Sequence, residues 1–297
     1  MKHLFWSWLV IVVIFPNVAF ACDVCGSSLS GSSWGILPPF RKGLLNTRTN
    51  FQQIRQLSTK TAQNFLSQDF SARFYPHQRW QLLVSGSFIH AQQKSYTLGD
   101  EKRFGLGDLQ FMGSYLWVDN SRDTSTSRFK HSFLTSAGVK LPTGSFRRLS
   151  ADGLINPYFQ LGTGSWDFPF NAVYTCRGQK YGFSTELFYK LNTENATHFQ
   201  FGNKMGAAQR FFLLRKLSRF SLMPQTGFLY EYNSVDYHRG QKMLPSGGQT
   251  LQFLANLDIY RKNFLFGLQL QIPIYQQNAS GEVLRGAMYS LNMSYIF

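Results

Sequence analysis

Three cysteines offer the most reactive side chains of this sequence. Cys22 and Cys25 form a C-x-x-C pair in "AFACDVCGSS", and Cys176 lies far along the chain. In an oxidising compartment such cysteines pair as disulfides. Cys22–Cys25 is the nearest pair, although either of the two can instead reach Cys176.

The three thiolates could alternatively bind a soft ion such as Cu(I). Lipidation of Cys22 fits the bulky Phe20 poorly, and a thioredoxin-like role lacks its βαβ unit. We expect a disulfide, with no metal and no cofactor.

A second group of residues with chemical potential is charged and follows a pattern of period two. Alternation of polar and apolar residues places the two kinds on opposite faces of a β-strand. Charges of both signs on one face could pair with one another across a narrow interior, or the basic ones could favour passage of anions. The residues predicted to line such an interior are Arg48, Arg73, Asp108, Lys140, Asp167, Glu186, Lys190, Lys204, Arg210, Glu231 and Asp258.

Catalysis is the alternative use of the polar residues. A hydrolase needs a nucleophile within reach of a base. His90, His131 and His198 lie in candidate strands, and serines are plentiful, but no nucleophile motif occurs. We predict that the chain is not an enzyme and has no catalytic residue.

The first residues indicate export. Lys2 and His3 precede the uncharged apolar run 4–15, and Ala19-Phe20-Ala21 offers small residues where a signal peptidase reads them. The run is shorter than the roughly 20 residues that a transmembrane helix needs. We therefore predict a cleaved signal peptide over residues 1–21.

Composition narrows the class further. Aromatic residues make up 16% of the chain and charged residues only 15%, whereas soluble domains carry about 25% charged residues. Many aromatic residues, few charges and a signal peptide together indicate an outer-membrane β-barrel, whose strands alternate lipid-facing and lumen-facing residues.

Alternating segments supply the strands of this barrel. The clearest is the terminal "AMYSLNMSYIF", where Tyr289, Leu291 and Phe297 share one face with the other apolar residues. A final strand that ends in an aromatic residue resembles the signal read by the outer-membrane assembly machinery. Candidate strands lie near 43–53, 68–75, 80–91, 108–118, 129–141, 165–175, 181–191, 198–212, 220–232, 251–259, 264–274 and 287–297.

The connections between these segments alternate in length. In a barrel of this kind the outward connections are longer than the periplasmic turns. We expect the long outward set to be 54–67, 92–107, 142–164, 192–197, 233–250 and 275–286. The short inward set is then 76–79, 119–128, 176–180, 216–219 and 261–263.

The chain is strongly basic, with 30 Lys and Arg against 15 Asp and Glu. No nucleic-acid motif is present, and an exported barrel would not meet nucleic acid. Basic turns beside a phospholipid leaflet are attracted to its headgroups. The turn residues concerned are Arg79, Arg177, Lys180, Arg215, Lys216, Arg219, Arg261 and Lys262.

Several motifs add a resemblance that covers roughly residues 70–297. These are "FGLGDLQFMGSYLW" (104–117), "GVKLPTGSF" (138–146), "LGTGSWDFPFNAVYT" (161–175) and "IPIYQ" (272–276). In this order they resemble the outer-membrane family linked to the meta-pathway of phenol degradation. The resemblance implies passage or binding of small molecules at the outer membrane, and no catalytic residue. Read locally, Pro142 to Gly144 end a strand, and Gly162 and Gly164 remove side chains where a strand bends or where backbones approach closely.

We predict an all-β protein: a single antiparallel transmembrane barrel of about twelve strands over 43–297, after a periplasmic extension or plug at 22–42. The expected location is the outer membrane of a Gram-negative bacterium. The expected function is passive passage of small, aromatic or anionic, solutes. A non-conducting structural or metal-binding barrel is the alternative, and a hydrolase embedded in the barrel a further one. Expected partners are outer-membrane lipid, the assembly machinery through Phe297 and a small-molecule solute.

Overall fold

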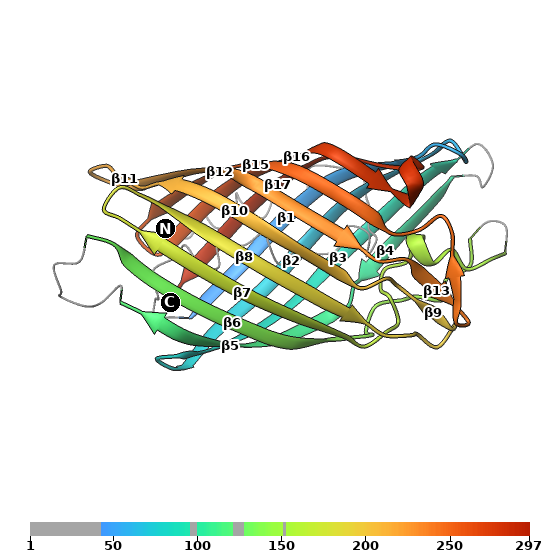
Figure 1. Ribbon diagram of the computed structural model, residues 1–297, viewed down its shortest axis with the longest axis horizontal. Coiled ribbons are helices and arrows are strands. Elements are labelled where there is room, and N and C mark those ends of the chain that lie inside the picture. Colours follow the sequence, from blue (N-terminus) through green and yellow to red (C-terminus); the bar gives the residue numbers. More distant parts are fainter. Residues whose placement is uncertain (1–42, 96–99, 121–127, 151–152) are drawn as a thin grey trace, which may run out of the picture.

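The computed structural model describes residues 43–95, 100–120, 128–150 and 153–297. Their strands form one closed antiparallel barrel of twelve strands, because each pairs with its neighbours along the chain and the last pairs with the first (Figure 1). The predicted fold class is confirmed. The wall consists of β1 (Leu44–Gln56), β2 (Thr61–His77), β3 (Trp80–Ser95), β4 with β5 (Glu101–Leu106 and Leu109–Asp119), β6 (Lys130–Leu141), β7 (Asp167–Arg177), β8 (Tyr181–Asn192), β10 (Lys204–Leu213), β12 (Ser221–Asn233), β15 (Gly248–Arg261), β16 (Phe264–Asn278) and β17 (Val283–Ile296).

The two ends of the barrel differ. At one end, here called the termini end, β1 begins and β17 ends (Figure 1). The predicted basic turns lie at this end. The other end, here called the loop end, carries a small sheet and two short helices (Figure 1). These elements are η3 (Pro157–Phe159), β9 (Phe199–Gln200), β13 (Asp236–His238), β14 (Gln241–Met243) and η4 (Ala279–Gly281), while β11 (Arg215–Lys216) belongs to a turn at the termini end.

Each strand presents an apolar face outward and a mainly polar face inward. On β8, Leu187 is 56% exposed while its neighbour Glu186 is 1% exposed. This alternation follows from the pleat of a strand. An exposed apolar outer face is what a hydrocarbon environment stabilises, so the wall is that of a transmembrane barrel.

Aromatic side chains cluster on the outer wall near the termini end. The Trp80 and Tyr115 ring centroids lie 5.0 Å apart, and those of Tyr115 and Trp117 lie 4.8 Å apart. Trp117 Nε1 donates to Thr135 Oγ1 at 2.8 Å. Amphipathic rings of this kind prefer the membrane–water interface, so this cluster marks one edge of the membrane-spanning band.

Three of the predicted long connections are wrong. β1 and β2 are joined by residues 57–60, β3 and β4 by 96–100, and β16 and β17 by 279–282. The strands continue beyond the apolar band because backbone pairing does not need an apolar face. Their outer side chains there bond to each other, as Gln53 Nε2 donates to Asn64 Oδ1 at 2.6 Å. The other long connections are confirmed, at 142–166, 193–203 and 234–247.

Some boundaries also shift. The strand expected at 68–75 begins at Thr61, and the one expected at 198–212 begins at Lys204. Gly162 and Gly164 lie in the connection between β6 and β7 and not in a bending strand, and the alternative expectation of a close backbone approach holds at Gly162. The predicted signal peptide 1–21 and extension 22–42, with Cys22 and Cys25, lie outside the described residues.

Helices contribute little to the structure. Among the described residues, no helix has the length and apolar character needed to cross a membrane.

Candidate functional site

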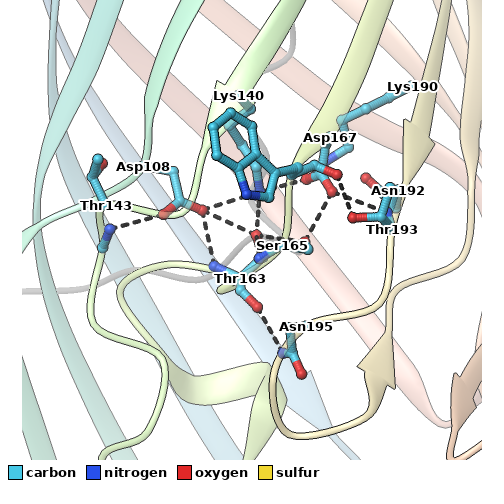
Figure 2. A network of polar contacts seen from close by, with 12 residues as sticks. Asp108, Lys140, Thr143, Thr163, Ser165, Asp167, Lys190, Asn192, Thr193 and Asn195 are labelled. Atoms are coloured by element: carbon cyan, nitrogen blue, oxygen red, sulfur yellow. Dashed lines mark hydrogen bonds and ion pairs between the residues drawn. The ribbon is translucent and has the colours of Figure 1, made fainter.

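Three sequence motifs that are far apart in the chain converge at the loop end of the barrel interior (Figure 2). Asp108 connects them. Its carboxylate accepts the Gly144 N–H at 2.9 Å, the Thr163 N–H at 2.9 Å and the Thr163 hydroxyl at 3.0 Å. Lys140 Nζ lies 3.0 Å from the same carboxylate. Asp108 therefore fixes both ends of the connection 142–166.

Two glycines let the second and third motifs approach each other. A side-chain carbon added at Gly144 would lie 2.9 Å from the Gly162 Cα, and one added at Gly162 would lie 2.8 Å from the Gly144 Cα. Real side-chain carbons essentially never come so close, so both positions require glycine. The motif glycines serve this close contact between backbones.

Lys140 and Asp167 extend the cluster across β6 and β7. Lys140 Nζ lies 2.5 Å from the Asp167 carboxylate and also donates to Thr163 Oγ1. Asp167 accepts the Ser165 hydroxyl at 2.9 Å, and Lys190 lies 3.9 Å from it. We call Asp108, Lys140, Thr163 and Asp167 the loop anchor (Figure 2).

The anchored connection 142–166 folds into the barrel mouth. Phe159 is fully buried and Leu161 is nearly so. The guanidinium of Arg103 on β4 lies 4.9 Å from the Phe159 ring centroid, and its Nη2 donates to Ser150 Oγ at 3.1 Å. Such a cation–π contact strengthens when it is shielded from water, so β4 holds the tip of the connection inside the mouth.

A cavity of about 400 Å³ lies beneath the loop end, which we call the vestibule. Its size falls within the roughly 300–1,000 Å³ typical of small-molecule sites. The lining mixes apolar, amide and charged side chains. It includes Ile54, Tyr158, Phe201 and Val283, together with Lys190, Lys204, Arg285, Asp236 and Glu282.

One buried carboxylate supports two cations of the vestibule. Glu231 on β12 lies 2.5 Å from Lys204 Nζ and 3.2 Å from Arg285 Nη1. It also accepts the Gln252 amide at 2.9 Å. Two positive charges therefore share one negative charge.

A second charged layer crosses the middle of the lumen. Arg210 Nη1 donates to Glu186 at 2.9 Å, and Asn171 donates to the other Glu186 oxygen at 3.0 Å. Arg48 on β1 interacts electrostatically with Asp69 beside it and with Glu186. Since five strands separate β1 from β8 in each direction around the barrel, Arg48 and Glu186 project into the lumen from opposite walls.

Side chains narrow the lumen at this level. Glu186, Arg210 and Asp258 are all less than 5% exposed to water, whereas Arg48 and Asp69 on the opposite wall are partly exposed. Beside the buried residues an apolar cluster of Phe188, Ala208, Leu229 and Leu254 covers the inner wall. The lumen is therefore packed along β8 to β15 and partly accessible beside β1 and β2.

The predicted interior residues all face inward and divide into several groups. Asp108, Lys140, Asp167 and Lys190 lie at the loop anchor, Lys204 and Glu231 at the vestibule, and Arg48, Glu186, Arg210 and Asp258 in the central layer. Arg73 is buried on β2 and belongs to none of these groups.

Sequence reasoning missed four functional residues. Asp69 lay at the edge of a strand predicted too short, and Arg103 and Arg285 fell in segments expected to be loops. Thr163 gave no charge signal. Every second residue of a strand faces inward, and applying this rule along the full length of each strand would have found the first three.

The histidines do not support the hydrolase alternative. His131 faces outward and its Nδ1 lies 2.8 Å from the Tyr174 hydroxyl, while the exposed His198 contacts Glu194. His90 also faces outward, against the Phe104 ring.

Cys176 likewise lies on the outer wall, near the termini end. In the described part of the chain it is a free cysteine, and no group of three metal-binding side chains occurs there. The disulfide and the metal site that involve Cys22 and Cys25 remain predictions.

We expect Cys22 and Cys25 to pair and Cys176 to remain a thiol. Alkylation of the unfolded, unreduced protein should then modify one cysteine, and reduction beforehand should expose all three. Peptide mapping by mass spectrometry identifies the site. Labelling of Cys22 or Cys25 without reduction would contradict the proposed pair.

The closed wall, outward apolar face and charged interior define a transmembrane β-barrel of the outer-membrane class. Among solved structures, the chain resembles an outer-membrane channel from Pseudomonas putida F1, with a TM-score of 0.69 at 13% identity over 90% of this chain and 98% of that one. It also resembles the β domain of the Bordetella autotransporter BrkA, with a TM-score of 0.50 at 9% identity over 86% and 100% of the two chains. These likenesses show the fold.

No protein-family model and no curated protein matches the sequence. Membership of the family linked to phenol degradation therefore stays a prediction from the motifs.

Proposed function

We propose that this protein lets small solutes cross the outer membrane of a Gram-negative bacterium. Solutes enter through the vestibule, with the loop end facing outward, and aromatic or anionic compounds are the classes suggested by the sequence. The observation that carries this proposal is a cavity of about 400 Å³ at the barrel mouth, above a lumen lined by polar and charged groups. The likeness to an outer-membrane channel supports it.

The proposed partners follow from the outer surface. Outer-membrane lipid surrounds the apolar face, and the basic turns lie beside the inner leaflet headgroups. The assembly machinery recognises the last strand through Phe297, whose ring is about half exposed on the outer wall.

The main alternative is a non-conducting structural barrel. The observation in its favour is the central layer, in which Arg48 and Glu186 interact across the lumen. Transport requires a path for solutes past this layer, whereas a structural role does not.

Conductance separates the two functions. We expect the refolded protein to show small, intermittent openings in a planar bilayer. Replacing Arg48 and Asp69 together by alanine should raise the unitary conductance about twofold or more, because it shortens two charged side chains that project into the central layer of the lumen. Removing both partners avoids leaving one buried charge unpaired.

The matched control is Arg55→Ala, on the same strand but on the outer face, which should leave the conductance unchanged. A folded barrel that stays silent in both wild-type and double-variant forms would refute passage of solutes and favour the structural alternative.

A further inference from the structure

Three basic side chains project from the outer wall at the loop end. Arg55 on β1, Lys94 on β3 and Lys102 on β4 are exposed and alternate with inward-facing residues. They lie where these strands continue beyond the apolar band, at the loop end of the barrel (Figure 1). Their charge therefore faces the surroundings of the barrel and not its lumen.

The pairing of the strands places these cations close together. Arg55 and Lys94 lie on the two sides of Ala62 of β2, each directly opposite it. Since neighbouring strands are about 4.8 Å apart, the two Cα atoms are separated by about 10 Å. Lys102 lies opposite Gln92, and its diagonal neighbour Lys94 is about 7–8 Å away. Long basic side chains at this spacing can share one large anionic group.

The three cations are not neutralised by the protein. The Nε of Arg55 donates to the Gln53 amide oxygen at 3.0 Å, and none of the three forms an ion pair within the described residues. Of the two carboxylates beside them in the chain, Asp100 is exposed and Glu101 is held by Arg103 at 2.6 Å. An excess of positive charge at one place on a surface attracts an anion.

The surface around these cations changes from apolar to polar along the strands. Two residues from Lys102 on the same outer face, the Phe104 ring packs against Phe88 with centroids 4.5 Å apart. At the level of Lys102 the neighbouring strands present amides, and Gln53 Nε2 donates to Asn64 Oδ1 at 2.6 Å. Hydrocarbon chains fit the rings, sugar hydroxyls fit the amides and phosphates fit the cations. This order is that of a phosphorylated glycolipid whose chains lie in the membrane.

The cations occupy one side of the barrel only. At the same end, β12 and β16 present the exposed side chains of Tyr230, Tyr232 and Tyr275 on the outer wall. Tyrosine suits any boundary between lipid and water. The basic surface on β1, β3 and β4 is therefore a local feature and not a general property of this edge.

We infer that this surface binds the lipid A part of lipopolysaccharide, the phosphorylated glycolipid of the outer leaflet. The inference rests on the orientation proposed above, in which the loop end faces outward. The lipid A phosphates bind Arg55, Lys94 and Lys102 through charge-assisted hydrogen bonds, and an acyl chain lies along Phe104.

Three lipids test this assignment. Native mass spectrometry of the detergent-solubilised protein would compare bisphosphorylated lipid A with its monophosphoryl form and with phosphatidylglycerol, an anionic lipid without the phosphorylated sugars. We expect lipid A to bind about fivefold more tightly than either of the other two, since one basic residue facing an anionic headgroup corresponds to about that factor.

Variants locate the surface. Lys94→Gln and Lys102→Gln should each weaken binding of lipid A about fivefold. Both side chains are exposed, so the amide should leave the fold unchanged. Arg55→Ala should also weaken lipid A while leaving the conductance unchanged. The control is Lys242→Gln, an exposed lysine of the small sheet at the same end, which should change nothing.

Binding in detergent is read without conductance, so the two proposals fail separately. A silent bilayer with intact lipid A binding would refute passage of solutes but not this surface. Absence of lipid A binding, or an equal loss in Lys242→Gln, would refute the surface even in a conducting barrel. Equal binding of either comparison lipid would refute recognition of the phosphorylated sugars.

Discussion

Asp108→Asn should release the connection 142–166 from the barrel mouth and lower the free energy of unfolding by about 3–5 kcal/mol, the usual effect of removing one partner from a buried ion pair. The substitution keeps the shape of the side chain but removes its charge. It also places an amide N–H₂ opposite one of the two backbone N–H groups, that of Gly144 or that of Thr163, because each is accepted at 2.9 Å by a different oxygen of Asp108. Buried donors left without an acceptor are costly.

Two measurements check this result. Urea unfolding in lipid vesicles, followed by tryptophan fluorescence, reports the global effect. Limited trypsin digestion reports the local one, because Arg147 and Arg148 lie in the connection, and Gln160 holds the Arg148 backbone in place. We expect cleavage at these residues to become about tenfold faster for each 1.4 kcal/mol by which local opening becomes easier.

The matched control is Asp100→Asn, an exposed aspartate at the same end of the barrel. It should unfold and digest like the wild type. If Asp108→Asn did the same, the loop anchor would not be what holds the connection in the mouth.

Glu186→Gln should produce the second large effect, in the middle of the barrel. It leaves Arg210 buried without the carboxylate that lies 2.9 Å away, although the hydrogen bond from Asn171 can be kept by the amide oxygen. Removal of one charge from a buried pair costs about 3–5 kcal/mol. The urea midpoint in vesicles should fall accordingly.

Adding Arg210→Met should restore most of this loss. The double variant removes both members of this ion pair, and methionine fills space beside the apolar cluster of Phe188 and Leu229. Buried pairs replaced by apolar side chains are often neutral or more stable. Glu194→Gln is the control, because its contact with His198 is exposed and such pairs contribute about 1 kcal/mol or less. A double variant as unstable as the single one would show that the deficit does not come from breaking the Arg210–Glu186 pair.

The barrel could be predicted because the membrane enforces a simple pattern. On β17, Tyr289 and Leu291 must face hydrocarbon while Ser290 faces the lumen, and every wall strand repeats this requirement. The same pattern could not locate the ends of those strands that continue beyond the apolar band. Gln53 and Asn64 are polar on the outer face, and a polar residue there has the composition of a loop although its backbone is paired.

The sequence predicts which charged residues face the interior, but not which of them contact one another. The alternation of residues along each strand places Lys140, Asp167 and Glu231 inside the barrel. Which of these side chains meet depends on the stagger of the strands and on the course of the connections. Thr163 shows this limit most clearly, since it reaches Asp108 beside the close backbone contact between Gly144 and Gly162. The apolar inner cluster around Leu229 and Leu254 was not predicted, because the inner face was read from its polar residues.

The seam between β1 and β17 determines the order in which this barrel can fold. All other neighbouring wall strands follow one another in the chain and can form as successive hairpins, but Leu44 pairs with Ile296 and the Phe297 N–H bonds to the Gly43 carbonyl. Until the final strand arrives, the growing sheet has two open edges, and open edges pair readily with foreign strands. Closing such a distant contact is also entropically slow. Chains cut short before β17 should therefore stay open sheets that aggregate, however well their remaining hairpins form.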